Sequence, residues 1–146
     1  MPQAASNPYN LQRFVDAQEP VYADVCRELR AGQKQSHWIW FIFPQIVGLG
    51  RSSTAQRFAI ESVDEAATYL AHPILGPRLR ECTRLTLEIE GRTAEEIFGS
   101  PDWMKFRSSM TLFAESADDG ALFVAALETF FEGENDDATL CLLGSL

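Results

Sequence analysis

Apolar residues recur at intervals of three and four along most of the chain, which is the period of an amphipathic helix. The pattern runs over residues 11–15 and resumes over 21–29, and Gly32 follows it directly. Pro20 suits a break between two helices or the first turn of the second one. The first part of the chain therefore predicts two helices, the second of which ends at Gly32.

Capping sequences mark further helix starts. Ser62 and Glu65 have the spacing of a capping box, as do Thr93 and Glu96. Residues 100–102 provide a cap residue, a proline and an acid in the order typical of a first helical turn. Helices are expected from 63 to about 72, from near 73 to about 90, after 93, from 101 to about 115, from about 121 to 132, and over 140–143.

The run Trp38-Ile39-Trp40-Phe41-Ile42-Phe43 is ambiguous, because aromatic and β-branched residues before a proline also suit a buried strand. A strand requires a partner, however, and no second segment has a strand pattern. A segment that is apolar on all sides suits a short central helix surrounded by other helices. We therefore expect an all-α fold, with residues 1–9 as a flexible N-terminus and residues 10–146 as a single helical domain packed around this segment.

Composition narrows the function classes. The chain of 146 residues has a net charge of −9, which argues against binding a nucleic-acid polymer. Residues 1–60 carry six of the 12 basic side chains but only four of the 21 acidic ones, so a small anion is attracted to that half. The sequence has no apolar run long enough to span a membrane and no signal-peptide pattern, which predicts a cytoplasmic protein. The three cysteines are interpreted as small buried apolar residues, and the two histidines have no ligand spacing for a metal, so neither a metal nor a cofactor is predicted.

Polar residues flank the aromatic run on both sides. Lys34 and His37 precede it, and Gln45 and then a glycine-rich stretch follow it. That stretch, with Gly48, Gly50 and Ser52 as candidate ligand-binding residues, offers backbone N–H groups and hydroxyls to an anion, although it lacks the P-loop spacing. The alternative is an ordinary turn with a serine cap. Trp38 and Trp40 are either core residues or a wall on which a ring stacks.

Two later helices carry polar residues near their apolar stripes. Arg78 falls between Leu85 and Ile89, so its guanidinium requires either an internal ion pair or an anionic ligand. Asp102, Lys105 and Ser109 share one edge of the helix that follows Pro101. These three either form the rim of a pocket or simply extend into solvent from the edge of the core.

Four blocks of this sequence resemble the signature of the uncharacterised bacterial family called domain of unknown function 1810. The blocks are 34–45, 48–50, 69–79 and 105–113, and the resemblance extends from about Leu11 to Leu143. It implies an all-α cytoplasmic domain with no established activity. The polar residues identified above from periodicity fall in or beside these blocks, which favours one shared pocket.

The leading hypothesis is a helical domain that binds, and in an enzyme would hydrolyse or transfer, a small anionic metabolite that is phosphorylated or nucleotide-like. Lys34, His72, Arg78 and Lys105 are the polar ligand-binding candidates outside the glycine-rich stretch, together with Gln45 and the two tryptophans. His37, Asp102 and Ser109 are the candidate catalytic residues, whereas structural roles are the alternative for both histidines. The competing hypothesis is a non-enzymatic protein-interaction module, and a homodimer is compatible with the same apolar stripes.

Overall fold

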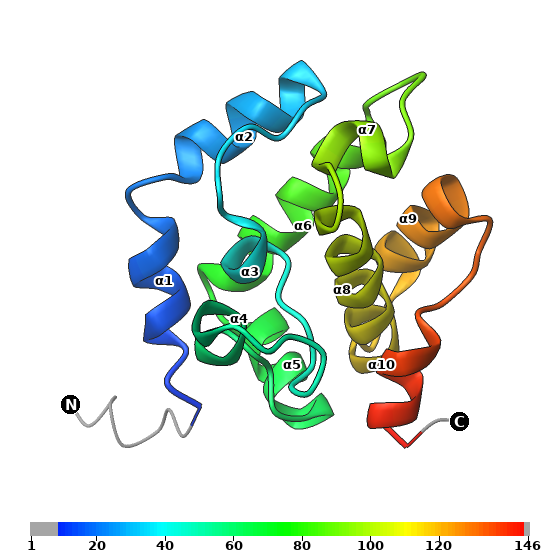
Figure 1. Cartoon of the computed structure of the whole chain (residues 1–146). Coiled ribbons are helices and arrows are strands. Elements are labelled where there is room, and N and C mark those ends of the chain that lie inside the picture. Colours follow the sequence, from blue (N-terminus) through cyan, green and yellow to red (C-terminus); the bar gives the residue numbers. More distant parts are fainter. Residues whose placement is uncertain (1–8, 145–146) are drawn as a thin grey trace.

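The computed structural model describes residues 9–144, which form ten helices and no strand (Figure 1). This confirms the expected all-α class. The flexibility predicted for residues 1–9 falls almost entirely outside the described residues. The helices are α1 (Gln12–Gln18), α2 (Tyr22–Ala31), α3 (Ile39–Ile42), α4 (Ser53–Arg57), α5 (Val63–Ala71), α6 (Leu75–Leu87), α7 (Ala94–Phe98), α8 (Asp102–Ser116), α9 (Ala121–Phe131) and α10 (Asp137–Leu142).

The helix boundaries follow the local signals closely. Gly32 ends α2 with a φ of +81°, a left-handed conformation that glycine adopts without steric cost. Thr93 and Glu96 form the complete capping box at α7. At α5 the box is incomplete, because Ser62 accepts a hydrogen bond from Glu65 N, whereas the Glu65 carboxylate accepts from Glu61 N instead. The start expected at Pro101 is also shifted, since Pro101 occupies the N-cap of α8 and makes no side-chain cap.

The aromatic run forms a helix at the centre of the molecule. The residues Trp38, Ile39, Ile42 and Phe43 are almost completely buried, and Phe43 N donates to Ile39 O at 3.0 Å. Trp40 is only half-buried, so this segment does have a side that reaches the surface. After Pro44 the chain forms one isolated parallel bridge, Ile46 with Ile60, the only β pairing among the described residues.

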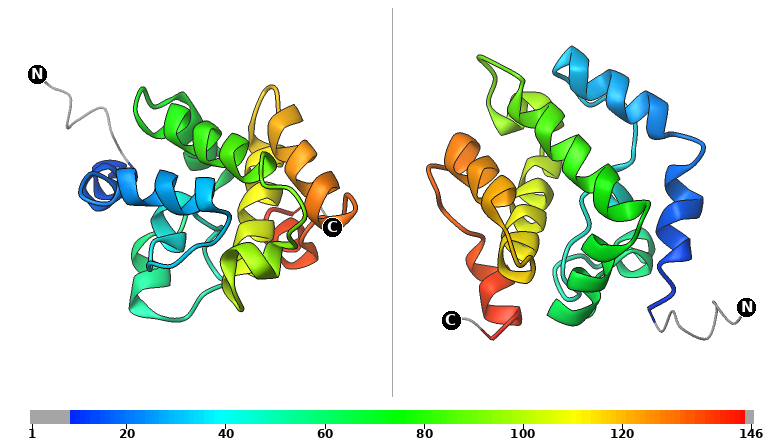
Figure 2. Two further views of the ribbon diagram at one scale, coloured as in Figure 1. Left: turned by 90° about the horizontal axis from the view of Figure 1, so that it is seen from above. Right: turned by 180° about the vertical axis from the view of Figure 1, so that it is seen from behind.

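Helix α8 is the other central element. It contacts α3, α5, α7, α9 and α10. In Figures 1 and 2, α3 and α4 lie on one side of α8 and α9 lies on the other. Its residues from Ser108 to Phe113 are all buried, including three hydroxyl residues. The stripe pattern therefore underestimates its burial, because neighbouring helices also cover the edges of the stripe.

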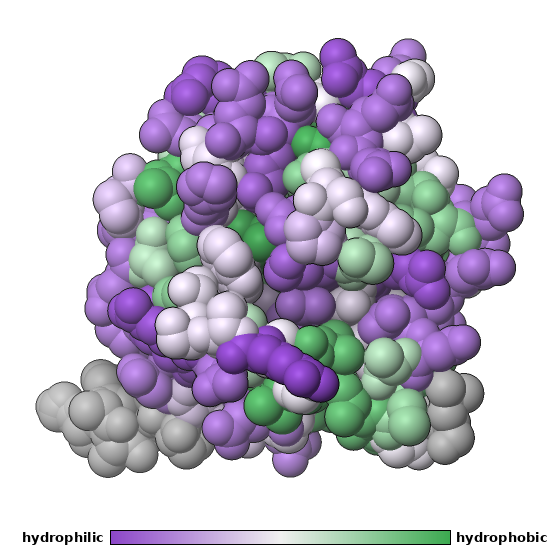
Figure 3. All heavy atoms as spheres, viewed as in Figure 1, coloured by the Kyte–Doolittle hydropathy of each residue, from purple (hydrophilic) through white to green (hydrophobic). Residues whose placement is uncertain are grey.

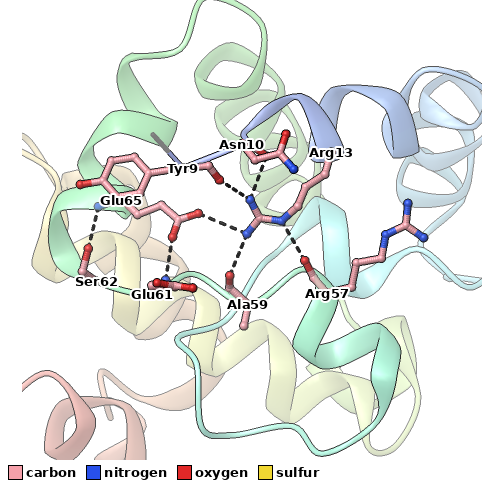
Figure 4. A network of polar contacts seen from close by, with 8 residues as sticks. All are labelled: Tyr9, Asn10, Arg13, Arg57, Ala59, Glu61, Ser62 and Glu65. Carbon is pink, nitrogen blue, oxygen red and sulfur yellow. Dashed lines mark hydrogen bonds and ion pairs between the residues drawn. The ribbon is translucent and has the colours of Figure 1, made fainter. Parts of the chain in front are cut away.

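The Arg13 guanidinium joins α1 to the connection between α4 and α5 (Figure 4). Each of its five N–H donors has an acceptor, which accounts for its full hydrogen-bonding capacity. The acceptors are the backbone oxygens of Tyr9, Asn10, Arg57 and Ala59 and the Glu65 carboxylate. Sequence analysis did not identify this network. Because every donor is used, Arg13 serves the fold and is not available to a ligand.

The cysteine expectation was only partly right. Cys26, which belongs to α2, and Cys82, which belongs to α6, are buried as expected. Cys141 is exposed on α10, because this short helix covers α8 with its other side. All three are free thiols.

Glu28, near the end of α2, organises the segment that leads into α3. The residue is only 5% exposed, and its carboxylate accepts four hydrogen bonds. The donors are Gln35 N at 2.7 Å, Ser36 N at 3.0 Å, Ser36 Oγ at 2.6 Å and Trp38 Nε1 at 2.9 Å. Burial by itself raises the pKa of Glu28, but these hydrogen bonds, with that from the Ser36 hydroxyl foremost, lower it to about 2.

Replacing this carboxylate by Glu28→Gln is expected to lower the free energy of unfolding at pH 7 by about 3 kcal/mol, because an amide nitrogen cannot accept the N–H groups around it. The folded pKa lies below the unfolded value, so the contribution is complete above about pH 4.5 and is lost as the pH falls towards 2. Denaturant unfolding at pH 7 and pH 3 measures the difference between the two proteins. A difference that is equal at both pH values would contradict this account, and the exposed Glu95→Gln is the control.

Candidate functional site

A pocket of about 360 Å³ lies between α3, the loop that follows it and the first turn of α8. Its residues come from two parts of the sequence, 40–55 and 101–105. We call it the cationic pocket, because Arg51 and Lys105 line it and no described residue in its lining carries a carboxylate. The lining consists of Trp40, Gln45, Leu49, Gly50, Arg51, Ser52, Ala55, Pro101, Met104 and Lys105.

Lys105 is positioned by a row of three charges at the start of α8. Asp102 lies between two lysines, with its Oδ2 2.8 Å from Lys34 Nζ and its Oδ1 3.2 Å from Lys105 Nζ. The Lys34 side chain is only 6% exposed, whereas those of Asp102 and Lys105 are each 19% exposed. The buried lysine therefore depends on Asp102 for its counter-charge, while Lys105 is the more accessible of the two.

Trp38 and Trp40 both contact this row of charges. Lys34 Nζ lies 5.3 Å from the Trp38 ring centroid, and Lys105 Nζ lies 6.0 Å from that of Trp40. These are cation–π distances, with the shorter one on the buried side. Trp40 thus places an aromatic wall next to an accessible ammonium group, which is a suitable environment for a ligand that combines a ring with an anion.

The loop can approach α4 closely because position 50 is a glycine. A Cβ at Gly50 would lie 2.4 Å from the Cβ of Ala55, well inside van der Waals contact. Ser52 caps α4 by accepting a hydrogen bond from Ala55 N at 3.1 Å. The glycine-rich stretch therefore forms a tight turn with a serine cap, one of the two alternatives left open by the sequence, and it also forms a wall of the pocket.

A second pocket of about 300 Å³ adjoins the first. We call it the neutral pocket, because no described residue in its lining is charged. Its lining consists of Trp40, Gln45, Ile46, Val47, Gly48, Gly50, Ala55, Gln56, Phe58 and Ala59.

A larger cavity, of about 450 Å³, lies elsewhere, among α5, α6 and the start of α9. Arg80 and Arg84 line it together with Asp118 and Asp119, so its charges balance. Arg80 Nη1 also donates to Leu70 O at 3.2 Å. Size alone would favour this cavity, but its balanced charge attracts an anion less than the cationic pocket does.

The structure brings together eight of the predicted site residues. Six of them line one or both of the adjoining pockets, namely Trp40, Gln45, Gly48, Gly50, Ser52 and Lys105. Lys34 and Asp102 lie directly beside them, in the row of charges that Asp102 forms with Lys34 and Lys105. The remaining five lie elsewhere, each for a structural reason.

Arg78 and His72 are held by polar groups of the protein itself. Arg78 Nη2 lies 2.6 Å from Glu19 Oε1, and Arg78 Nη1 donates to Gln18 Oε1 at 3.3 Å, so the internal ion pair is the alternative observed. His72 caps α6, with its Nδ1 accepting hydrogen bonds from Ile74 N and Leu75 N. Burial lowers the pKa of His72, which favours the neutral ring that this acceptor role requires.

The other three lie outside both pockets. Trp38 is a core residue whose indole N–H binds Glu28. His37 is exposed in the segment before α3 and lines neither pocket. Ser109 is fully buried, because the edge of α8 on which it lies is covered by other helices, and its Oγ has no hydrogen-bond partner among the described residues. The structure therefore does not support the expectation of a pocket rim at Ser109.

Sequence reasoning missed Arg51, the second cation of the pocket. Its position within the glycine-rich stretch, directly before the Ser52 cap, was a usable signal. Met104 and Pro101 were missed as apolar wall residues, and only the packing of the loop against α8 identifies them.

Residues 9–144 contain no group of three or more His, Cys, Asp or Glu side chains that could hold a metal ion. Within the same range, every helix is too short or too polar to cross a membrane.

Comparisons with known proteins agree with this fold. The model of a family described as "Protein of unknown function (DUF1810)" matches residues 8–143, which confirms the resemblance found in the sequence. The crystal structure of the conserved hypothetical protein Rv1873 from Mycobacterium tuberculosis is similar to this chain, with a TM-score of 0.93 and 53% identity. The match covers 94% of this chain and 98% of that one. No curated protein matches the chain.

Replacing the central carboxylate by Asp102→Asn is expected to lower the free energy of unfolding by on the order of 2 kcal/mol, because Lys34 then loses its counter-charge while remaining buried. Asp24→Asn is the matched control, since it removes the partner of the exposed Arg27 and should leave the melting temperature nearly unchanged. Thermal unfolding followed by circular dichroism measures both variants. Equal small effects would show that the Lys34 ammonium finds another partner or reaches water.

Proposed function

The chain belongs to the DUF1810 family of proteins of unknown function, and we propose that it binds a small anionic, phosphorylated metabolite in the cationic pocket. One observation carries this proposal. In a chain of net charge −9, the pocket is lined by two cations and, among the described residues, by no carboxylate. An isolated positive region on an acidic protein attracts small anions.

The two cations differ in what they offer a ligand. The Arg51 guanidinium is planar and can bind two phosphate oxygens at once, whereas the Lys105 ammonium acts as a point charge. Asp102 keeps Lys34 as its nearer partner, so Lys105 can turn towards a ligand without leaving the carboxylate unpaired. The pocket volume of about 360 Å³ lies at the lower end of the range for small-molecule sites.

The arrangement supports binding more directly than catalysis. Asp102 is bound by two lysines, Ser109 is buried away from the pocket, and His37 is exposed outside its lining. None of the three candidate catalytic residues has a base or nucleophile partner at the pocket, as acid–base or covalent catalysis requires. We therefore propose a binding function.

A second candidate is a protein-interaction surface on the same face of the molecule. Figure 3 shows apolar side chains gathered over the loop after α3 and over α10. Val47 is 44% exposed and Leu142 is 50% exposed. A Cβ on Gly48 would lie 3.3 Å from Leu142 Cδ2, so the loop and α10 are in contact there. An exposed apolar group of this kind favours a protein partner, with a second copy of the chain as the simplest one.

Isothermal titration calorimetry with inorganic phosphate, pyrophosphate, sugar phosphates and nucleotides tests the metabolite proposal. Lys105→Met and Arg51→Met are each expected to weaken the tightest ligand at least tenfold, and raising the salt concentration should weaken it further. Arg27→Met removes an exposed arginine outside the pocket and serves as the charge-matched control. The proposal fails if no anion in the panel binds, or if the bound anion is indifferent to both pocket variants.

Analytical ultracentrifugation tests the second candidate. A dimer that becomes monomeric in Leu142→Asp would support self-association through the apolar surface over α10. A wild-type protein that stays monomeric at high concentration would exclude a homodimer at this surface.

A further inference from the structure

We infer that the anion is a nucleoside phosphate, with its phosphate in the cationic pocket and its planar base in the neutral pocket. This inference rests on the proposed function, since it requires the cationic pocket to hold the phosphate. It adds the class of ligand and a role for the second pocket, which an inorganic or sugar phosphate would leave unused.

The two pockets adjoin one another. Trp40, Gln45, Gly50 and Ala55 line both of them, so these four residues lie at the junction. Two of the four, Gly50 and Ala55, are the smallest residue types, so no bulky side chain stands at these two positions. In the inferred complex the ligand extends from one pocket into the other past this junction.

The pockets differ in chemistry in the way that the two ends of a nucleotide differ. The cationic pocket presents Arg51 and Lys105, whereas the neutral pocket presents mainly apolar surface with the amide groups of Gln45 and Gln56. A sugar phosphate has no flat apolar face and would leave hydroxyl groups without partners against such a lining. A heterocyclic base has both an apolar face and polar edges, which suits the neutral pocket.

Gln45 is the group best placed to bind the base. Its backbone oxygen accepts a hydrogen bond from Ile60 N at 2.8 Å, which fixes the position of the residue. Its side-chain amide makes no hydrogen bond to any described residue, although it lines both pockets. An amide can donate and accept at once and so matches the paired donor and acceptor on the edge of a base.

The aromatic wall at the junction adds a second contact. Trp40 is half-buried and lines both pockets, and Lys105 lies over its ring on the cationic side. Phe58 forms part of the apolar floor of the neutral pocket. Stacking of a base on an aromatic side chain is independent of the identity of the base, so Trp40 would favour nucleotides in general and Gln45 would select among them.

Calorimetry with four probes tests this inference: adenosine 5′-monophosphate, uridine 5′-monophosphate, adenosine and ribose 5-phosphate. At least one of the two nucleotides is expected to bind tenfold or more tightly than ribose 5-phosphate and than adenosine. Gln45→Leu is expected to weaken the tighter nucleotide at least tenfold, and by more than it weakens ribose 5-phosphate, whereas Lys105→Met should weaken both. Val47→Phe, which fills the neutral pocket only, should act like Gln45→Leu.

Three results would overturn the inference. If ribose 5-phosphate binds as tightly as both nucleotides with the same dependence on Lys105, the anion site stands and the base site does not exist. If a nucleotide binds Gln45→Leu and Val47→Phe as tightly as it binds the unchanged protein, its base lies outside the neutral pocket. Failure of both nucleotides to bind removes the inference, while the proposed function fails only if every anion of the wider panel is also silent.

Discussion

The buried carboxylate of Glu28 determines how the segment between α2 and α3 is arranged, and with it the start of α3. The segment between α2 and α3 has no regular structure, yet it must end with Trp38 inside the core. Four donors from this segment converge on the one carboxylate, which replaces the hydrogen bonds of a missing helix or sheet. Because the indole N–H of Trp38 is among them, the start of α3 is fixed, and Trp40 follows two residues later at the edge of the pocket.

The same segment also supplies the charge that supports the pocket. Lys34 N donates to Ile97 O at 2.7 Å, and Lys34 Nζ pairs with Asp102, so the segment is attached to both α7 and α8. Asp102 then holds Lys105 at a distance of 3.2 Å, which is a looser contact than that to Lys34. An anion in the proposed site would compete with the Asp102 carboxylate for Lys105.

Local features of the fold could be predicted from the sequence, whereas pairings across the fold could not. The end of α2 at Gly32 and the Thr93 cap depend on neighbouring residues only. The partner of Arg78 is different, because the periodicity showed that this guanidinium needs an acceptor but not that Glu19, at the C-cap of α1, would provide it. Ser109 was misplaced because a helical projection assumes that one side faces water, and α8 is covered on nearly every side.

The candidate pocket was partly predictable for the same reason. Residues within the aromatic run and the glycine-rich stretch are close in sequence, so their shared location could be expected, and Trp40, Gln45 and Gly50 do line one pocket. That Lys105 joins them depends on the docking of α8 against the loop, which no local pattern records. Arg51 was missed because the hypothesis for this stretch assigned anion binding to backbone N–H groups and hydroxyls and not to its one charged side chain.

The distance in sequence between the two walls of the cationic pocket has a consequence for folding. Residues 40–55 and 101–105 are separated in the chain by α5, α6 and α7, so the pocket exists only where tertiary packing brings the two segments together. A partly folded chain therefore lacks the pocket altogether, and a ligand bound there would recognise the finished tertiary structure alone. Such a ligand would slow global unfolding and local opening of α8 together, so its presence in a cell would lengthen the lifetime of the protein against proteases.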